Sequence, residues 1–159
     1  MSEKMISSPA NRFRGRSEHS LDGKGRMNIP ARFRDVLLRE YDDRLLITPP
    51  WQKCLRIYPL QEWERKEQAL LSLERQKPHV AKMVRYLIGG SVECQSDKNG
   101  RILLPVHLRN QLNLDKDIIM NGMLTFFEVW RKETWEIEST VSDQDFIDFD
   151  QTFNDLGMF

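Results

Sequence analysis

An internal repeat constrains the fold of this 159-residue chain more than any other feature. Residues 22–34 align without gaps on residues 97–109, with identities at an Asp, a Gly, two Arg and a Pro, and with apolar residues at matched positions. A second pair of blocks aligns residues 55–64 with residues 127–136. The distance between aligned residues is three residues shorter in this pair than in the first. Shared residues in two separate blocks at a nearly fixed period indicate a duplicated structural unit.

Each copy contains an Asp-x-x-Gly-Arg turn. The Asp side chain can accept hydrogen bonds from backbone N–H groups further along the turn, and Gly adopts the positive φ that the turn requires. We therefore expect Asp22 and Gly25 to organise the first turn, and Asp97 and Gly100 the second.

After the turn, each copy predicts a short strand, a helix, a β-like run and an alternating strand. Pro30 and Pro105 suit the first position of the helix, and the spacing of Phe33 and Leu37 places both on its inner face. Such a unit of about 45 residues is too small to be stable alone, so the two copies should pair around one core.

The remaining segments are helical or acidic in pattern. Residues 60–88 read as helices broken at Lys77-Pro78, and the chain after Glu138 is acidic with interspersed Phe, which fits a terminal helix or a tail. The predicted fold class is α+β, in five parts: an N-terminal extension (1–12), a first repeat (16–63), a helical linker (64–91), a second repeat (92–135) and an acidic helix or tail (136–159).

Charge is divided unevenly along the chain, although the net charge is zero. Residues 1–109 carry a formal +8 and residues 110–159 a formal −8. This asymmetry suggests a basic surface for a polyanion and an acidic tail, but solvated charge on an ordinary globule would look the same. With two Cys and no apolar run near the roughly 18 residues of a membrane helix, the sequence favours a globular protein of a reducing cytoplasm.

At three motifs the chain resembles the MraZ family: Phe13-Arg14-Gly15, His19 to Arg34, and Glu93 to Pro105. That family is similar to AbrB-type transcription factors, so the resemblance implies a swapped-hairpin β-barrel made within one chain, with flanking helices. It also implies a cytoplasmic, nucleoid-associated bacterial regulator, commonly a repressor. Such regulators are ring-shaped homo-oligomers that bind tandem direct repeats in double-stranded DNA upstream of the division and cell-wall gene cluster. The residues before Phe13 and the acidic C-terminus lie outside the family signature.

The resemblance also assigns DNA contact to the Asp-x-x-x-Arg turns, and the residue chemistry agrees. Arg can bind guanine O6 and N7 bidentately, and Lys is a mobile partner for phosphate. The candidate DNA-binding residues are Lys24, Arg26, Lys98, Arg101 and, as an N-terminal phosphate clamp, Arg14. For Arg26 the alternative is a pair with Asp22 that only shapes the turn, and both roles can coexist. Arg32 and Arg34 are expected on the solvent face of the helix or at an interface.

Catalytic and metal-binding patterns are absent from the sequence. It has no Gly-x-x-x-x-Gly-Lys-[Ser/Thr] loop, no Gly-x-Ser-x-Gly elbow, no Cys-x-x-Cys and no His-x-x-x-His. We therefore expect neither an enzyme nor a bound cofactor. The main alternative to a DNA-binding regulator is an AbrB-like module that binds a protein through its basic or acidic face.

Overall fold

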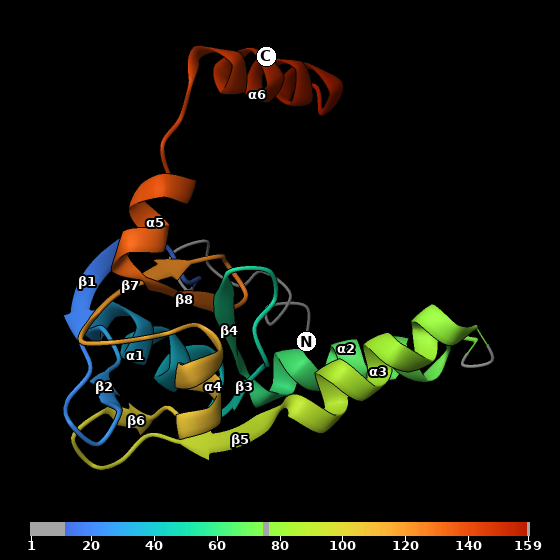
Figure 1. The fold of residues 1–159 in the computed structure, drawn as a ribbon. Coiled ribbons are helices and arrows are strands. Elements are labelled where there is room, and N and C mark those ends of the chain that lie inside the picture. The colour runs from blue at the N-terminus through green and yellow to red at the C-terminus, as the bar shows by residue number, and fades with distance from the viewer. Residues whose placement is uncertain (1–11, 75–76, 159) are drawn as a thin grey trace.

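The computed structural model describes residues 12–74 and 77–158, and in it both copies contain the same elements in the same order (Figure 1). The first copy comprises β1 (Arg16–Ser20), β2 (Arg26–Asn28), α1 (Ala31–Glu40), β3 (Arg44–Ile47), β4 (Cys54–Pro59) and α2 (Leu60–Leu71). The second comprises β5 (Val92–Gln95), β6 (Arg101–Leu103), α4 (Val106–Gln111), β7 (Asp117–Gly122), β8 (Phe127–Arg131) and α5 (Lys132–Glu138). Between them lies α3 (Pro78–Gly90), and α6 (Asp143–Asp155) follows the second copy.

Strands are exchanged reciprocally between the two copies. The first strand of each copy pairs with the third strand of the other, β1 with β7 and β5 with β3, while β4 pairs with β8 across the middle. The resulting six-stranded sheet has the order β1-β7-β8-β4-β3-β5, and β2 and β6 form a separate two-stranded sheet. Because only the hairpins β3–β4 and β7–β8 lie within one copy, neither copy retains its sheet without the other. The expected pairing of two copies around one core is confirmed.

The core is built by both copies around three aromatic rings. Phe33 of α1 contacts Phe127 of β8 with ring centroids 5.0 Å apart, and Phe13 meets each of them at 5.4 Å. Phe13 precedes β1 and is fixed by a two-way backbone bridge to Leu124. Aromatic pairs in such tilted and edge-on arrangements stabilise a core beyond the apolar area they bury. The segment just before the first predicted repeat is thus part of the core.

Three local features differ from the sequence expectation. Each Asp turn is preceded by a strand, β1 or β5, that the predicted four-element unit lacks. Pro30 and Pro105 are N-caps in extended conformation, one position before the first helical residue. The helical pattern was expected to end at residue 88, but Gly89 and Gly90 are the last two residues of α3, and Ser91 is its C-cap. The strand β1 was missed because its sequence, RSEHS, is polar throughout, and it is held by backbone pairing at the sheet edge.

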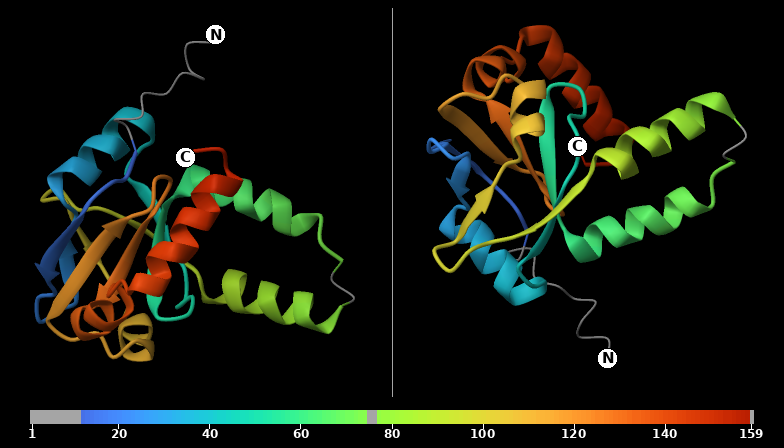
Figure 2. Two further views of the ribbon diagram at one scale, coloured as in Figure 1. Left: turned by 90° about the horizontal axis from the view of Figure 1, so that it is seen from above. Right: turned by 60° about the horizontal axis from the view of Figure 1, so that its bottom comes forward.

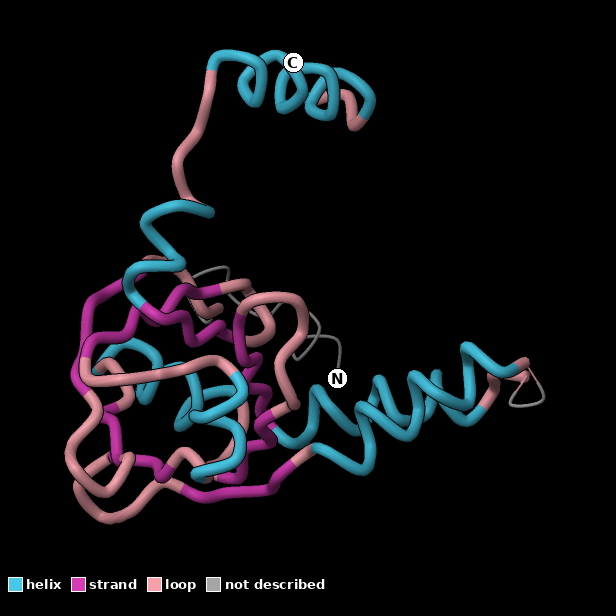
Figure 3. The backbone as a smooth tube through the Cα atoms, viewed as in Figure 1, coloured by secondary structure: helices cyan, strands magenta, loops and turns pink. Residues whose placement is uncertain are grey.

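The helices outside the sheet take two arrangements. The long helices α2 and α3 project from the same side of the body and are called the α2–α3 arm; Figure 2 shows them apart from each other, and the base of α2 is anchored by the buried Leu60 and Trp63 (Figures 1 and 2). The tube in Figure 3 shows α5 against the strands and α6 separated from them by a loop. Within the described part of the chain, no helix is long and apolar enough to cross a membrane.

Replacing Phe13 should test whether this residue belongs to the core. Phe13→Ala removes a fully buried ring and should lower the free energy of unfolding by about 3–5 kcal/mol, the usual cost of such a truncation. Leu38→Ala, at a side chain 79% exposed on α1, should cost about 0.5 kcal/mol or less. Urea unfolding of both variants measures this, and equal stabilities would contradict the assignment.

Candidate nucleic-acid interface

The two Asp turns have the same hydrogen-bond pattern. One oxygen of Asp22 accepts from the backbone N–H of Lys24 and of Arg26, both at 2.9 Å, and Gly25 has φ +85°. In the second turn, one oxygen of Asp97 accepts from the backbone N–H groups two and four residues on, at 2.8 and 3.0 Å, and Gly100 has φ +75°. A carboxylate that binds the turn backbone in this way holds the loop in one shape.

The second oxygen of each Asp orients the arginine of its turn. The Nε of Arg26 donates to Asp22 at 2.6 Å, and that of Arg101 donates to Asp97 at 3.1 Å. Hydrogen bonds from the Arg26 backbone and side chain and from the Lys24 backbone lower the pKa of Asp22 to about 2. Equivalent bonds lower the pKa of Asp97. The turn-shaping pair that the sequence allowed is therefore present, and it leaves 34% of the Arg26 side chain and 30% of the Arg101 side chain exposed.

The strands that leave these turns pair into a short antiparallel ribbon. The register pairs Arg26 with Leu103, Met27 with Ile102, and Asn28 with Arg101. Two further backbone bonds extend it by one residue at each end, from Leu104 to Gly25 (2.9 Å) and from Ile29 to Gly100 (3.0 Å). Since residues 27 and 102 are equivalent in the repeat, the approximate two-fold axis relating the copies passes through the centre of this ribbon.

The outer face of the ribbon carries two arginines and one amide. Side chains alternate between the faces of a strand, so Arg26, Asn28, Arg101 and Leu103 point outward while Met27 and Ile102 are buried. Diagonal neighbours such as Arg26 and Arg101 lie about 7–8 Å apart on an antiparallel pair. The major groove of B-DNA admits a two-stranded ribbon of this kind. This face, with its two flanking turns, is called the ribbon face below.

Each turn is supported by an arginine from the helix of the other copy. A Cβ added to Gly25 would lie 2.6 Å from the guanidinium carbon of Arg109 on α4, and one added to Gly100 would lie 2.4 Å from Nη1 of Arg34 on α1. Arg109 is also held by donation from its Nε to the carbonyl of Leu104 at 3.0 Å. These arginines add positive charge beside both turns and explain why only Gly fits there.

Sequence reasoning did not assign three residues to this face. Arg34 was expected on the solvent face of its helix or at an interface; it is exposed, and its guanidinium also packs on the opposite turn. The available signal was the identity of Arg34 and Arg109 as the last residues of the aligned blocks. Asn28 gave no signal because the second copy has Leu103 at that position, and only the strand register shows that it faces outward.

The other predicted residues divide between two places. Lys24 and Lys98 are exposed at the tips of the two turns. Arg14 is exposed at the opposite end of β1 from the Asp22 turn, and the strand between them spans roughly 16 Å at about 3.3 Å per residue. The carbonyl of Arg14 accepts from Nε of Arg32 at 3.0 Å. Any phosphate contact made by Arg14 would therefore be separate from the ribbon face.

The cysteines and potential metal ligands form no site in the described residues. Burial raises the pKa of the Cys54 thiol and of the Cys94 thiol to about 12, so neither is a reactive thiolate at neutral pH. Across residues 12–74 and 77–158, no group of three or more His, Cys, Asp or Glu side chains is arranged to hold a metal ion.

Comparison with known proteins finds one family over nearly the whole described chain. The family described as "MraZ protein, putative antitoxin-like" matches residues 12–85 and 87–155, one match for each copy. Transcriptional regulator MraZ of Syntrophobacter fumaroxidans is 44% identical over 124 residues, which is 78% of this chain and 82% of that protein. Transcriptional regulator MraZ of Thermoanaerobacter sp. is 38% identical over 144 residues, covering 91% of this chain and 98% of the relative. That of Thioalkalivibrio sulfidiphilus is 45% identical over 123 residues, covering 77% and 82%.

A pair of glycine substitutions tests the close approach at the first turn. Gly25→Ala places a Cβ at positive φ against Arg109 and should lower the free energy of unfolding by about 1–2 kcal/mol. Gly23→Ala is the matched control, because an added Cβ there meets nothing within 4 Å. Thermal unfolding of the two variants measures the difference, and a Gly25→Ala protein as stable as the Gly23→Ala protein would refute this packing.

Proposed function

The chain belongs to the MraZ family, and on that premise we propose that it is a sequence-specific DNA-binding transcriptional regulator whose ribbon face enters the major groove. As the family resemblance implies, it would act as a repressor on tandem direct repeats upstream of the division and cell-wall gene cluster, in the cytoplasm and at the nucleoid. Its relatives carry the name transcriptional regulator, which supports the regulatory role.

The observation that carries the proposal is the pair of oriented arginines on the ribbon face. Arg26 and Arg101 each donate Nε to an aspartate, so their terminal nitrogens are held in one direction before DNA arrives. A pre-oriented guanidinium loses little side-chain entropy on binding and can donate bidentately to guanine. Lys24 and Lys98 at the turn tips suit phosphate contacts, which set register and affinity without reading sequence.

The two halves of the ribbon face differ at one outward position, and we propose that this difference gives the bound DNA box a direction. Asn28 can bind adenine through its amide, whereas the equivalent Leu103 offers only an apolar contact of the kind that suits a thymine methyl group. A symmetric ribbon would suit a palindromic box and would bind DNA equally well in either orientation. A ribbon with Asn on one side and Leu on the other favours one orientation, which suits boxes arranged as direct repeats.

Several chains acting together in one oligomer would supply the affinity that a single ribbon lacks. A single ribbon offers few base contacts, and a ring-shaped homo-oligomer on tandem boxes converts later contacts into intramolecular ones at high effective concentration. The fold proposed for the chain is the swapped-hairpin barrel of AbrB-type proteins, which its two repeats form together. The reciprocal exchange of β1 and β5 supports that proposal.

Removing the ribbon arginines should weaken DNA binding strongly. Arg26→Ala and Arg101→Ala should each cost about 1–3 kcal/mol, a roughly 5- to 150-fold rise in Kd, because each removes a base contact. Fluorescence anisotropy with a labelled fragment of the chain's own upstream region measures this. Arg39→Ala is the matched control, since Arg39 on α1 also pairs with an Asp four residues earlier but lies outside the ribbon face.

Two outcomes of this titration would count against the proposal. Unchanged binding by an Arg26→Ala, Arg101→Ala double variant would remove the ribbon face from the interface. Weak binding by the unmodified chain that ignores scrambling of the repeats would favour the protein-interaction module. The salt dependence of binding measures the contribution of the phosphate contacts, because log affinity should fall linearly with log salt concentration.

Replacing Asp22 should reduce selectivity rather than total affinity. Asp22→Asn keeps an oxygen for the turn backbone but removes the acceptor for Arg26 Nε, so the arginine loses its orientation while the repulsion of phosphate decreases. The ratio of affinities for operator and scrambled DNA should fall, with binding to scrambled DNA undiminished. Since the pKa of Asp22 is lowered to about 2, its ion pair is lost only as pH falls from about 4 toward 2, and the effect should be constant between pH 6 and 8. An unchanged ratio in Asp22→Asn would show that Asp22 does not position Arg26, and Asp35→Asn is the matched control.

A further inference from the structure

The C-terminal helix α6 presents a stripe of exposed apolar side chains. Phe146, Phe149 and Leu156 lie along it at helical spacing, with exposed fractions between 47% and 67%. The helix begins with a capping box between Ser142 and Asp145, and it stands away from the sheet in Figure 1. A helix of 13 residues is marginal in water without tertiary contacts. An amphipathic stripe of this kind is typical of a helix that docks in a groove.

The charge of α6 indicates what kind of groove it fits. The segment 139–158 contains no Lys or Arg, and it carries five aspartates: Asp143, Asp145, Asp148, Asp150 and Asp155. Two of these, Asp148 and Asp150, flank Phe149. A matching surface therefore needs an apolar cavity for a phenyl ring and positive charge immediately beside it.

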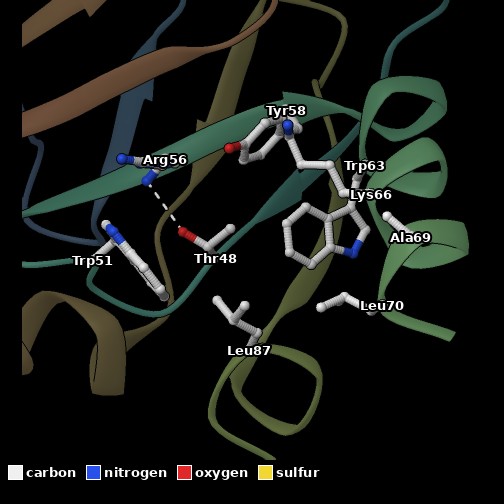
Figure 4. A pocket seen from close by; sticks show the side chains of 9 residues that line it. All are labelled: Thr48, Trp51, Arg56, Tyr58, Trp63, Lys66, Ala69, Leu70 and Leu87. Atoms are coloured by element: carbon white, nitrogen blue, oxygen red, sulfur yellow. Dashed lines mark hydrogen bonds between the residues drawn. The ribbon is translucent and has the colours of Figure 1, made fainter. Parts of the chain in front are cut away.

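The body of the protein has such a cavity beside the base of the α2–α3 arm (Figure 4). Its volume is about 270 Å³, and its walls include the rings of Trp51, Tyr58 and Trp63 and the side chains of Leu70 and Leu87. An apolar cavity of roughly 150 Å³ already holds a benzene ring. This cavity, called the aromatic–basic pocket below, can therefore accept a Phe side chain from outside.

Two cations lie on the walls of the aromatic–basic pocket. The guanidinium carbon of Arg56 is 5.8 Å from the ring centroid of Trp51, and Lys66 Nζ is 5.5 Å from that of Tyr58. The Nε of Arg56 is buried and has no hydrogen-bond partner among the described residues. The indole N–H of Trp63 donates to Glu67 at 3.1 Å. A buried donor without a partner is costly, so an incoming carboxylate would stabilise this site.

We propose that α6 of one chain docks in the aromatic–basic pocket of a second, identical chain. Phe149 enters the cavity, and Asp148 and Asp150 pair with Arg56 and Lys66. The pocket is filled by α6 of a second chain rather than by the chain's own α6, because an ion pair between Glu138 and Lys53 holds the C-terminal end of α5 on the body. In Figure 1 a loop carries α6 away from the base of the α2–α3 arm, where the pocket residues lie.

The inference deepens the homo-oligomer part of the proposed function and does not depend on DNA binding. In Figure 1, α6 and the ribbon face lie at opposite ends of the molecule. Docking of α6 on a neighbour therefore leaves both ribbon faces open. The same separation means that α6 does not shield the ribbon face of its own chain.

Disulfide trapping between full-length chains tests the contact. One variant carries Phe149→Cys, another carries Ala69→Cys at the exposed rim of the pocket, and the two are mixed and oxidised. The expected product is a cross-linked pair of chains joined at positions 149 and 69. A non-reducing gel detects the pair, and peptide mapping identifies the joined positions. Native Cys54 and Cys94 should contribute little background, because burial raises the pKa of both thiols. Leu38→Cys, at another exposed position, on α1, replaces Ala69→Cys as the control and should not cross-link.

Charge reversal and mass measurement separate the possible failures. Lys66→Glu should reduce the yield of the 149–69 cross-link at least several-fold, and Asp150→Lys in the other chain should restore it. A single chain that carries both cysteines serves as a further test. If its positions 149 and 69 link to each other within that chain, docking in a second chain is overturned. An oligomer seen by light scattering without the cross-link would overturn the inference while leaving the homo-oligomer proposal standing, and a monomer would overturn both.

Discussion

The reciprocal exchange of strands between the two copies is the constraint on which the rest of the structure depends. Since β1 pairs only with β7 and β5 only with β3, the sheet exists only when both copies are present. This exchange brings β2 and β6 together on the axis that relates the copies. The ribbon face is therefore not a property of either copy. It is produced by their pairing, and any substitution that separates the copies removes the ribbon as well as the core.

The same exchange makes each Asp turn depend on both copies. The turn of one copy is closed by its own Asp and Gly, but it rests on an arginine from the helix of the other, Arg109 under Gly25 and Arg34 under Gly100. The turn arginines are thus fixed in two ways, by the carboxylate within the turn and by the packing below it. Rigid support of this kind lets a short ribbon hold two guanidinium groups in a set relation, which flexible loops would not maintain.

The sequence predicted the turns well because their chemistry is local. The spacing of Asp22, Gly25 and Arg26 specifies hydrogen bonds within five residues, so no tertiary information was needed. By contrast, β1 has no apolar alternation to reveal it, and its strand character comes from backbone pairing with β7, about 100 residues away. Arg109 and Asn28 were missed for a related reason. One acts across the two copies, and the other faces outward only through the register of a strand pair that the sequence does not encode locally.

The uneven charge of the chain acquires a spatial meaning from these arrangements. The positive charges beside the two turns gather at the ribbon face, and five aspartates without a basic residue lie on α6 at the other end of the molecule. Because charges act only over about 8 Å at physiological salt, the aspartates of α6 do not weaken DNA binding at the distant ribbon face, and in the proposed contact they meet the basic pocket of a neighbouring chain at short range. Under the two proposals, a chain of zero net charge carries one surface for a polyanion and another for its own kind. Because these surfaces lie apart, contacts between chains would not compete with contacts to DNA.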